Sequence, residues 1–244
     1  MFSDSDVERA KSLIFQKFYF PDKPSQLMWT DEDSEPIEDL DSIFEDIEGI
    51  DRIACGCTKV VLFPSYCNKF VIKIPFLGMV EYGSQEKNPF GGVCYYKDAD
   101  YRTIKSKWDH CSLEEFIYNN AVNHGLGDMF CGTKYIGKID RFPVYISERS
   151  GYALDEDYGH SPSEEGIKYS ASKSSGDKVS CYNMPAGMEP ETLALFYDSW
   201  GKELTDKLVD FLLDNHISDC HNGNVAFRDG KIRIIDYPGF YKYK

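Results

Sequence analysis

The chain has 244 residues, of which 42% are hydrophobic, 15% aromatic and 28% charged, a composition typical of a globular protein with a sizeable core. Its formal net charge of −14 makes a nucleic-acid backbone or an anionic membrane a poor partner for the whole surface. No window approaches about 18 apolar residues, and the N-terminus lacks an apolar signal core, so we expect no membrane span and no secretory signal. The eight cysteines lack the C-x-x-C spacing of a zinc site, and we expect reduced thiols in a cytoplasmic protein.

The first part of the chain, residues 1–50, is expected to be a helical and acidic segment. Residues 4–18 open with Ser and Asp as capping residues and have apolar residues at helical spacing. The dense acidic run DEDSEPIEDLDSIFEDIEGID at 31–51 contains a second possible helix at 40–47. We interpret this run as a solvated face or arm, and the alternative is a docking segment for a protein partner.

Short strands are expected over residues 51–148. RIACGC, TKVVLF, KFVIKIPF, KYIGKI and FPVYISER are apolar, β-branched runs separated by turn-forming residues, and the last two are expected to form a hairpin. Between these runs lies SLEEFIYNNAVNHGLG, with Ser112 as a candidate N-cap and Gly125 as the end. This pattern predicts a helix over 112–124.

The last part, residues 149–244, begins with a stretch at 150–190 that is rich in Ser, Gly, Asp and Tyr and is expected to be loop-like. From Pro190, apolar residues recur at intervals of three and four, which predicts a long amphipathic helix ending around Asn215. The runs VAF and KIRIID then predict a tight hairpin across residues 228–230.

Polar residues concentrate around this last hairpin. Asp219 and Asn224 share one loop, and Asp236 comes directly after the second apolar run. A hairpin brings its two ends together, so Asn224 and Asp236 are expected side by side. Their oxygens suit Mg²⁺, which usually takes one or two carboxylates plus substrate phosphates, while Asp219 is free to accept a hydroxyl proton. The alternative is that all three residues only cap loops and turns.

With this order of residues, ISDCHNGN resembles the catalytic loop of the protein-kinase-like superfamily, and IIDYPG resembles its metal-binding segment. The histidine at position 221 makes the loop similar to that of aminoglycoside and choline phosphotransferases, which resembles HGDLHPGN. The resemblance implies Asp219 as catalytic base, Asn224 and Asp236 as metal ligands, and ATP and Mg²⁺ as cofactors. It also implies an α+β, two-lobe fold with an antiparallel-sheet small lobe and a reduced helical large lobe.

Three further parts of the superfamily have counterparts upstream, in the expected order. CGCTKVVL, with Gly56, resembles the turn that covers the phosphates. Lys73, on the apolar strand FVIKIPF, resembles the lysine that contacts the α- and β-phosphates, and Glu114 resembles the helix glutamate that pairs with it; Glu115 is the alternative. Without the resemblance, Lys73 is a snorkelling strand lysine and Gly56 an ordinary turn glycine.

The strand FPVYISER resembles the strand that leads into the adenine hinge, which puts Ser147 and Glu148 at the edge of the hinge as expected nucleotide contacts. Two histidines flank Asp219, and a 2-His-1-carboxylate metal site is conceivable. We favour other roles for them: His216 caps the long helix at its C-terminal end, and His221 orients the loop through a backbone carbonyl.

The sequence departs from the superfamily in two places. The metal-binding segment reads D-Y-P-G, with one extra residue before its glycine, and four residues follow Phe240 where protein kinases continue with a substrate-docking block. We therefore expect a phosphotransferase of reduced size that acts on a small molecule or a protein hydroxyl. The alternative is a weakly active or inactive, pseudokinase-type binding module that works through protein contacts. An unrelated structural protein fits only if the order of the motifs is coincidence.

Overall fold

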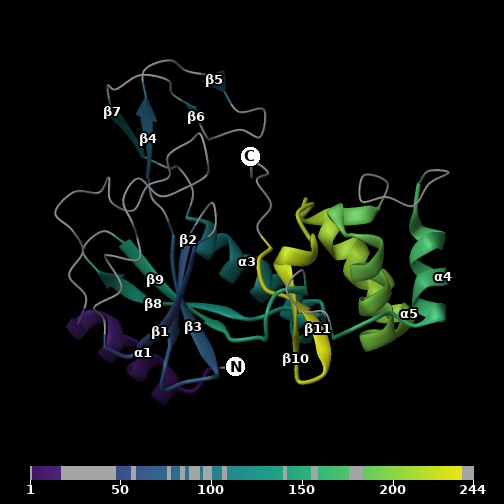
Figure 1. Ribbon diagram of the computed structural model, residues 1–244, viewed down its shortest axis with the longest axis horizontal. Coiled ribbons are helices and arrows are strands. Elements are labelled where there is room, and N and C mark those ends of the chain that lie inside the picture. Colours follow the sequence, from purple (N-terminus) through teal and green to yellow (C-terminus); the bar gives the residue numbers. More distant parts are fainter. Residues whose placement is uncertain are drawn as a thin grey trace. The chain divides into compact units, whose positions relative to one another are not determined.

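The computed structural model of the protein describes residues 2–17, 48–55, 59–75, 78–82, 86–87, 94–95, 101–105, 109–139, 142–154, 159–175 and 184–237. The predictions for Gly56, for the possible helix at 40–47 and for residues 31–47 of the acidic run lie outside these residues. The protein is α+β, and its chain divides into two compact units (Figure 1). The first unit contains Met1–Glu115 and Thr133–Glu148, and the second contains Phe116–Gly132 and Arg149–Lys244.

A five-stranded antiparallel sheet forms the body of the first unit, in the order β1-β2-β3-β9-β8 (Figure 1). Its strands are β1 (Ile50–Cys55), β2 (Lys59–Pro64), β3 (Phe70–Pro75), β8 (Thr133–Ile139) and β9 (Phe142–Glu148). They coincide with the predicted apolar runs, so the antiparallel sheet is confirmed. The same unit has two short antiparallel pairs: β4 (Gly78–Tyr82) with β7 (Tyr101–Lys105), and β5 (Glu86–Lys87) with β6 (Cys94–Tyr95).

One face of this sheet forms the apolar core of the first unit together with α1 (Asp4–Lys17). The buried side chains of this core come from both: Val7, Ala10, Leu13, Ile14, Val60, Leu62, Ile72, Ile74, Val144 and Ile146. Ser3 and Asp6 begin the helix as a capping box, because each side chain bonds to the other residue's backbone N–H. The helix was expected in a separate segment, but it belongs to the first unit because its apolar stripe completes this core.

The helix α3 (His110–Asn123) begins at His110, and its cap is Asp109, not Ser112 as predicted. Asp109 Oδ1 accepts the N–H of Ser112 at 3.0 Å, and Oδ2 accepts the hydroxyl of Tyr145 at 2.5 Å. Burial raises the pKa of Asp109 and, together with this bond, the pKa of Tyr145. The helix start is thereby attached to β9. From Phe116 onward, α3 belongs to the second unit.

The second unit contains α4 (Glu164–Lys173), α5 (Pro190–Asp214) and a hairpin of β10 (Val225–Arg228) and β11 (Lys231–Ile234). The helices α4 and α5 run side by side in Figure 1. Short 3₁₀ turns described in this unit include η2 (Gly127–Met129), η5 (Pro185–Gly187) and η6 (Asn222–Asn224). The predicted long helix is confirmed, with a kink at Gly201, whose φ is 78°, and the predicted final hairpin is confirmed as well. Among the described residues, no helix has the length and apolar character needed to cross a membrane.

The helix α4 was not predicted, because residues 150–190 were expected to be loop-like. Its segment EEGIKYSASK has few apolar residues, and aspartates on α5 add polar contacts to it: Asp198 accepts from the N-cap Ser163, and Asp206 accepts from further residues. Asp206 accepts hydrogen bonds from Tyr169 at 2.8 Å, from Lys173 at 2.5 Å and from Lys202 at 2.6 Å. These hydrogen bonds, from Lys173 first and Lys202 next, lower the pKa of Asp206. Polar contacts to α5 therefore hold this helix in place.

Candidate functional site

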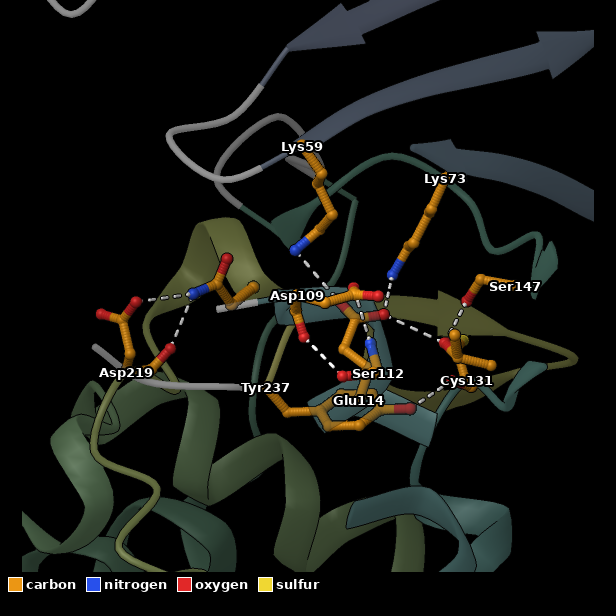
Figure 2. Close-up of polar contacts among 11 residues, drawn as sticks. Lys59, Lys73, Asp109, Ser112, Glu114, Cys131, Ser147, Asp219 and Tyr237 are labelled. Atoms are coloured by element: carbon orange, nitrogen blue, oxygen red, sulfur yellow. Dashed lines mark hydrogen bonds and ion pairs between the residues drawn. The ribbon is translucent and has the colours of Figure 1, made fainter. Parts of the chain in front are cut away.

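Two lysines of the sheet bind one buried carboxylate in the first unit. Lys73 Nζ on β3 lies 2.7 Å from Glu114 Oε2, and Lys59 Nζ on β2 lies 2.8 Å from Glu114 Oε1. Figure 2 shows both side chains reaching from the strands to Glu114 on α3. Glu114 is 0% exposed, Lys59 2% and Lys73 4%. The predicted pairing of Lys73 with Glu114 is confirmed, whereas Lys59 was not predicted.

Strand register explains why both lysines face the same carboxylate. Val61 lies directly opposite Lys73, and paired residues of an antiparallel sheet point to the same face. Lys59 precedes Val61 by two residues, so it also points to this face. The apolar neighbours Val60 and Ile72 point to the opposite face and enter the core with α1. Period-two alternation thus places two ammonium groups on the side of the sheet that meets Glu114.

Two hydroxyl groups complete the surroundings of Glu114. Thr133 Oγ1 on β8 donates to Glu114 Oε2 at 3.0 Å and is hydrogen-bonded to Ser147 Oγ on β9 at 3.1 Å. Ser147 is buried, and its strand lies between β3 and β8, so its side chain points into the unit and is not presented at an edge. Glu148 is half-buried at the end of β9. The nucleotide contacts expected of Ser147 and Glu148 stay predictions.

The neighbouring carboxylate has a different partner. Glu115 Oε1 accepts the backbone N–H of Tyr135 at 3.1 Å and so attaches α3 to β8. Of the two glutamates considered for the lysine, Glu114 is the one that binds it. Cys111, one turn earlier on the helix, is buried, and burial followed by the charge of Glu114 raises the pKa of its thiol well above the usual value. This thiol is therefore not available as a thiolate nucleophile.

The second unit brings Asp219, Asn224 and Asp236 together around the β10–β11 hairpin. The backbone N–H groups of Ile235 and Asp236 both donate to Asn224 O, at 2.9 and 3.4 Å. The prediction that Asn224 and Asp236 lie side by side is confirmed. Burial and, after it, the charges of Asp219 and Asp236 raise the pKa of the Cys220 thiol, because both carboxylates lie near it.

The side chain of Asn224 is oriented by Asp219. Its Nδ2 donates to the backbone oxygen of Asp219 at 2.7 Å and lies 3.4 Å from Asp219 Oδ2 (Figure 2). Because the amide nitrogen faces Asp219, the amide oxygen points away from it and can act as a ligand. The Asp219 side chain is 37% exposed. This set of oxygens fits Mg²⁺, which takes few protein ligands and adds phosphate oxygens and water.

The two histidines lie where they were expected, at the C-terminal end of α5 and on the Asp219 loop, but they act through other contacts than those expected. His221 Nδ1 accepts the N–H of Gly223 at 3.0 Å, so the ring orients the loop by accepting from an N–H and not through a carbonyl. His216 follows α5 with a φ of 55°, and its backbone N–H donates to Leu213 O, so the main chain ends the helix. No group of three or more His, Cys, Asp or Glu side chains in the described part of the chain could hold a metal, which argues against the 2-His-1-carboxylate site.

The loop that carries Asp219 is fixed to the start of α5 by contacts that sequence reasoning missed. Asn222 Nδ2 donates to Glu189 Oε2 at 2.5 Å, and the buried hydroxyl of Thr192 donates to Asn222 Oδ1. The N–H of Cys220 donates to Ala186 O at 3.2 Å. Each partner lies about thirty residues away along the chain, and no local motif marks it.

Comparisons with protein-family models, with curated proteins and with solved structures give no match to this chain. The resemblance to the protein-kinase-like superfamily therefore stays a prediction from the motifs of the sequence.

Exchange of Glu114 for glutamine tests the buried cluster. The E114Q variant keeps the size of the side chain but leaves two buried ammonium groups facing a neutral amide. Removing one partner of a buried pair costs about 3–5 kcal/mol, and we expect a loss of unfolding free energy in this range by chemical denaturation. The matched variant E115Q keeps an oxygen for the Tyr135 N–H and should lose less than about 1 kcal/mol. Equal losses of unfolding free energy in both variants would show that the cluster around Glu114 contributes no more to stability than the Glu115–Tyr135 bond does.

Exchange of Gly187 tests how the loop is held. Gly187 has a φ of 66°, and a Cβ there would lie 2.0 Å from Ser218 O. Gly230 has a similar φ of 74° but nothing within 4 Å of an added Cβ, so G230A measures the backbone cost alone, about 1–2 kcal/mol. We expect G187A to lose clearly more unfolding free energy than G230A, since the backbone at Ser218 must also move. A G187A variant as stable as G230A would contradict the close packing of the two backbones.

Proposed function

We propose that the protein is an ATP-dependent phosphotransferase with a protein-kinase-like fold, which acts on a small molecule or on a protein hydroxyl. The observation that carries the proposal is the buried bond between Lys73 Nζ and Glu114 Oε2 at 2.7 Å. A lysine on the third strand paired with a glutamate on the following helix is the arrangement that holds nucleotide phosphates in protein kinases. The antiparallel sheet, with α3 in the connection between β3 and β8, supports the same fold.

In this proposal the first unit contributes the cations for the nucleotide. Lys73 contacts the α- and β-phosphates, and Glu114 keeps its ammonium group charged and oriented. Thr133 donates a 3.0 Å hydrogen bond to Glu114 Oε2, the same carboxylate oxygen that Lys73 binds. A charge fixed in this way before the nucleotide arrives needs no reorganisation on binding, which favours affinity and rate.

The second unit contributes the base and the metal ligands. Asp219 accepts the proton of the attacking hydroxyl, since its carboxylate is partly exposed and its neighbour Asn224 holds the loop backbone. Asn224 and Asp236 hold the magnesium ion with oxygen atoms. When bound, the ion neutralises the phosphate charge that would otherwise oppose ATP binding to a chain with a net charge of −14.

A second candidate function is a pseudokinase-type module that works through protein contacts. The segment CGCTKVVL favours it, because it has one glycine where the phosphate-covering turn of the superfamily often has three. The two candidates differ in whether bound nucleotide is turned over, and this can be measured directly.

Nucleotide binding should depend on metal through Asp236. A ligand at a hundredfold excess over Kd stabilises the folded state by about 2.7 kcal/mol, which for a chain of this size raises Tm by about 5–10 °C. We expect this shift with MgATP, and little shift with ATP plus chelator or with MgATP on D236N. The control D229N exchanges an exposed aspartate at the tip of the same hairpin and should behave as wild type. A wild-type protein that shows no shift with MgATP would overturn the proposed function.

Turnover should depend on Asp219. A positioned base contributes about 10²–10⁴-fold to rate, so D219N should lose this much phosphate transfer or ATP hydrolysis while its Kd for MgATP changes little. Radiolabelled ATP would follow transfer to the protein, to added acceptors or to water. Binding without any transfer in wild type would favour the pseudokinase-type module, and equal turnover in wild type and D219N would show that Asp219 is structural.

A further inference from the structure

The second lysine on Glu114 has no role in the function proposed so far. Lys59 is buried to the same extent as Lys73, and its ammonium group lies 2.8 Å from the other oxygen of the same carboxylate. The resemblance places Lys59 in CGCTKVVL, the segment expected to cover the phosphates, but gives the lysine itself no role. The sequence also gives no sign of it, because TKVVLF reads as an ordinary strand with a polar residue at its start.

The position of Lys59 in the sheet indicates what it could contact. It is the first residue of β2, and the residue opposite it in register is Pro75, the last residue of β3. Lys59 therefore lies at the end of the β2–β3 pair, next in the chain to the turn expected to cover the phosphates, and on the same face as Lys73. One anion that reaches Lys73 at this end of the sheet meets the ammonium group of Lys59 as well.

The two buried ammonium groups can both donate to a ligand with several negative charges. Lys73 alone gives Glu114 a buried partner, so a structural tie between sheet and helix needs one lysine. A second buried ammonium group on the same carboxylate adds a desolvation cost and a repulsion between like charges. A polyphosphate bound to both lysines opposes that repulsion, because each ammonium group gains charge-assisted hydrogen bonds to oxygen.

We propose that Lys59 is a second phosphate-binding lysine, which acts with Lys73 on the phosphates of a nucleoside di- or triphosphate while both are oriented by Glu114. This inference rests on the proposed function and adds a residue to its nucleotide site. It implies that Lys73 is not the sole anchor of the phosphates, so loss of either lysine weakens binding and loss of both weakens it further.

The test compares MgATP with AMP, which lacks the β- and γ-phosphates. Titration calorimetry would give Kd for both ligands on wild type, K59M, K73M and the double variant, with K134M as control because Lys134 is an exposed lysine of the same sheet. Loss of a hydrogen bond to a charged group corresponds to about 10–100-fold in affinity. We expect K59M to weaken the binding of MgATP by this factor and the binding of AMP much less. The ratio of the AMP Kd to the MgATP Kd should therefore fall. K134M should leave the ratio unchanged.

The outcomes separate the two proposals. If wild type binds MgATP and K59M keeps the wild-type ratio, Lys59 only ties the sheet to the helix and this inference is wrong, while the proposed function stands. If wild type does not bind MgATP, both fail. Should K59M not fold, K59Q replaces it, because its amide keeps a polar donor beside the Glu114 carboxylate without the charge. MgATP must then bind K59Q more weakly relative to AMP than it binds wild type, and an unchanged ratio of the two Kd values would overturn the inference.

Discussion

The carboxylate of Glu114 is the constraint on which the first unit depends. A charge with no exposed surface is stable only when partners and hydrogen bonds replace the water that it has lost. Here Lys59, Lys73 and Thr133 supply them, from β2, β3 and β8 respectively. One side chain of α3 therefore connects the helix to three of the five strands, on the face of the sheet that the core with α1 leaves uncovered. An apolar contact in place of Glu114 would not require the β2–β3 register that puts both lysines on one face, because the hydrophobic effect is non-directional.

The second unit uses a different kind of constraint. The residues proposed as base and metal ligands lie on a loop and a hairpin, and main-chain hydrogen bonds together with the side-chain contacts of Asn222 and Asn224 determine their positions. The N–H groups of Ile235 and Asp236 meet one oxygen of Asn224, and Cys220 is bonded to Ala186. A loop that is held in this way is a suitable support for a base and a metal site, because catalysis depends on geometry that is fixed before the substrate binds.

Sequence reasoning was successful where chemistry and local periodicity coincide. A lysine inside an apolar strand and a glutamate on an amphipathic helix are conspicuous, and the ends of a tight hairpin must meet. Lys59 was missed because it stands at a strand start, where a polar residue is ordinary. The helix α4 was missed because Asp206, a residue far along the chain, supplies the contacts that its own apolar residues do not. The Thr192–Asn222 bond was missed for the same reason: no periodicity connects residues that meet only in the folded chain.

The contact of Gly187 with the backbone of Ser218 has a consequence for how the chain can change in evolution. Two main chains meet there, and the side chain of Ser218 takes no part in the close approach to the glycine. Substitutions at position 218 are thus compatible with the contact, whereas position 187 has a single acceptable residue. Among relatives of this protein, a glycine at this point would identify the loop more reliably than the residue at position 218, whose side chain can vary while the path of the chain is kept.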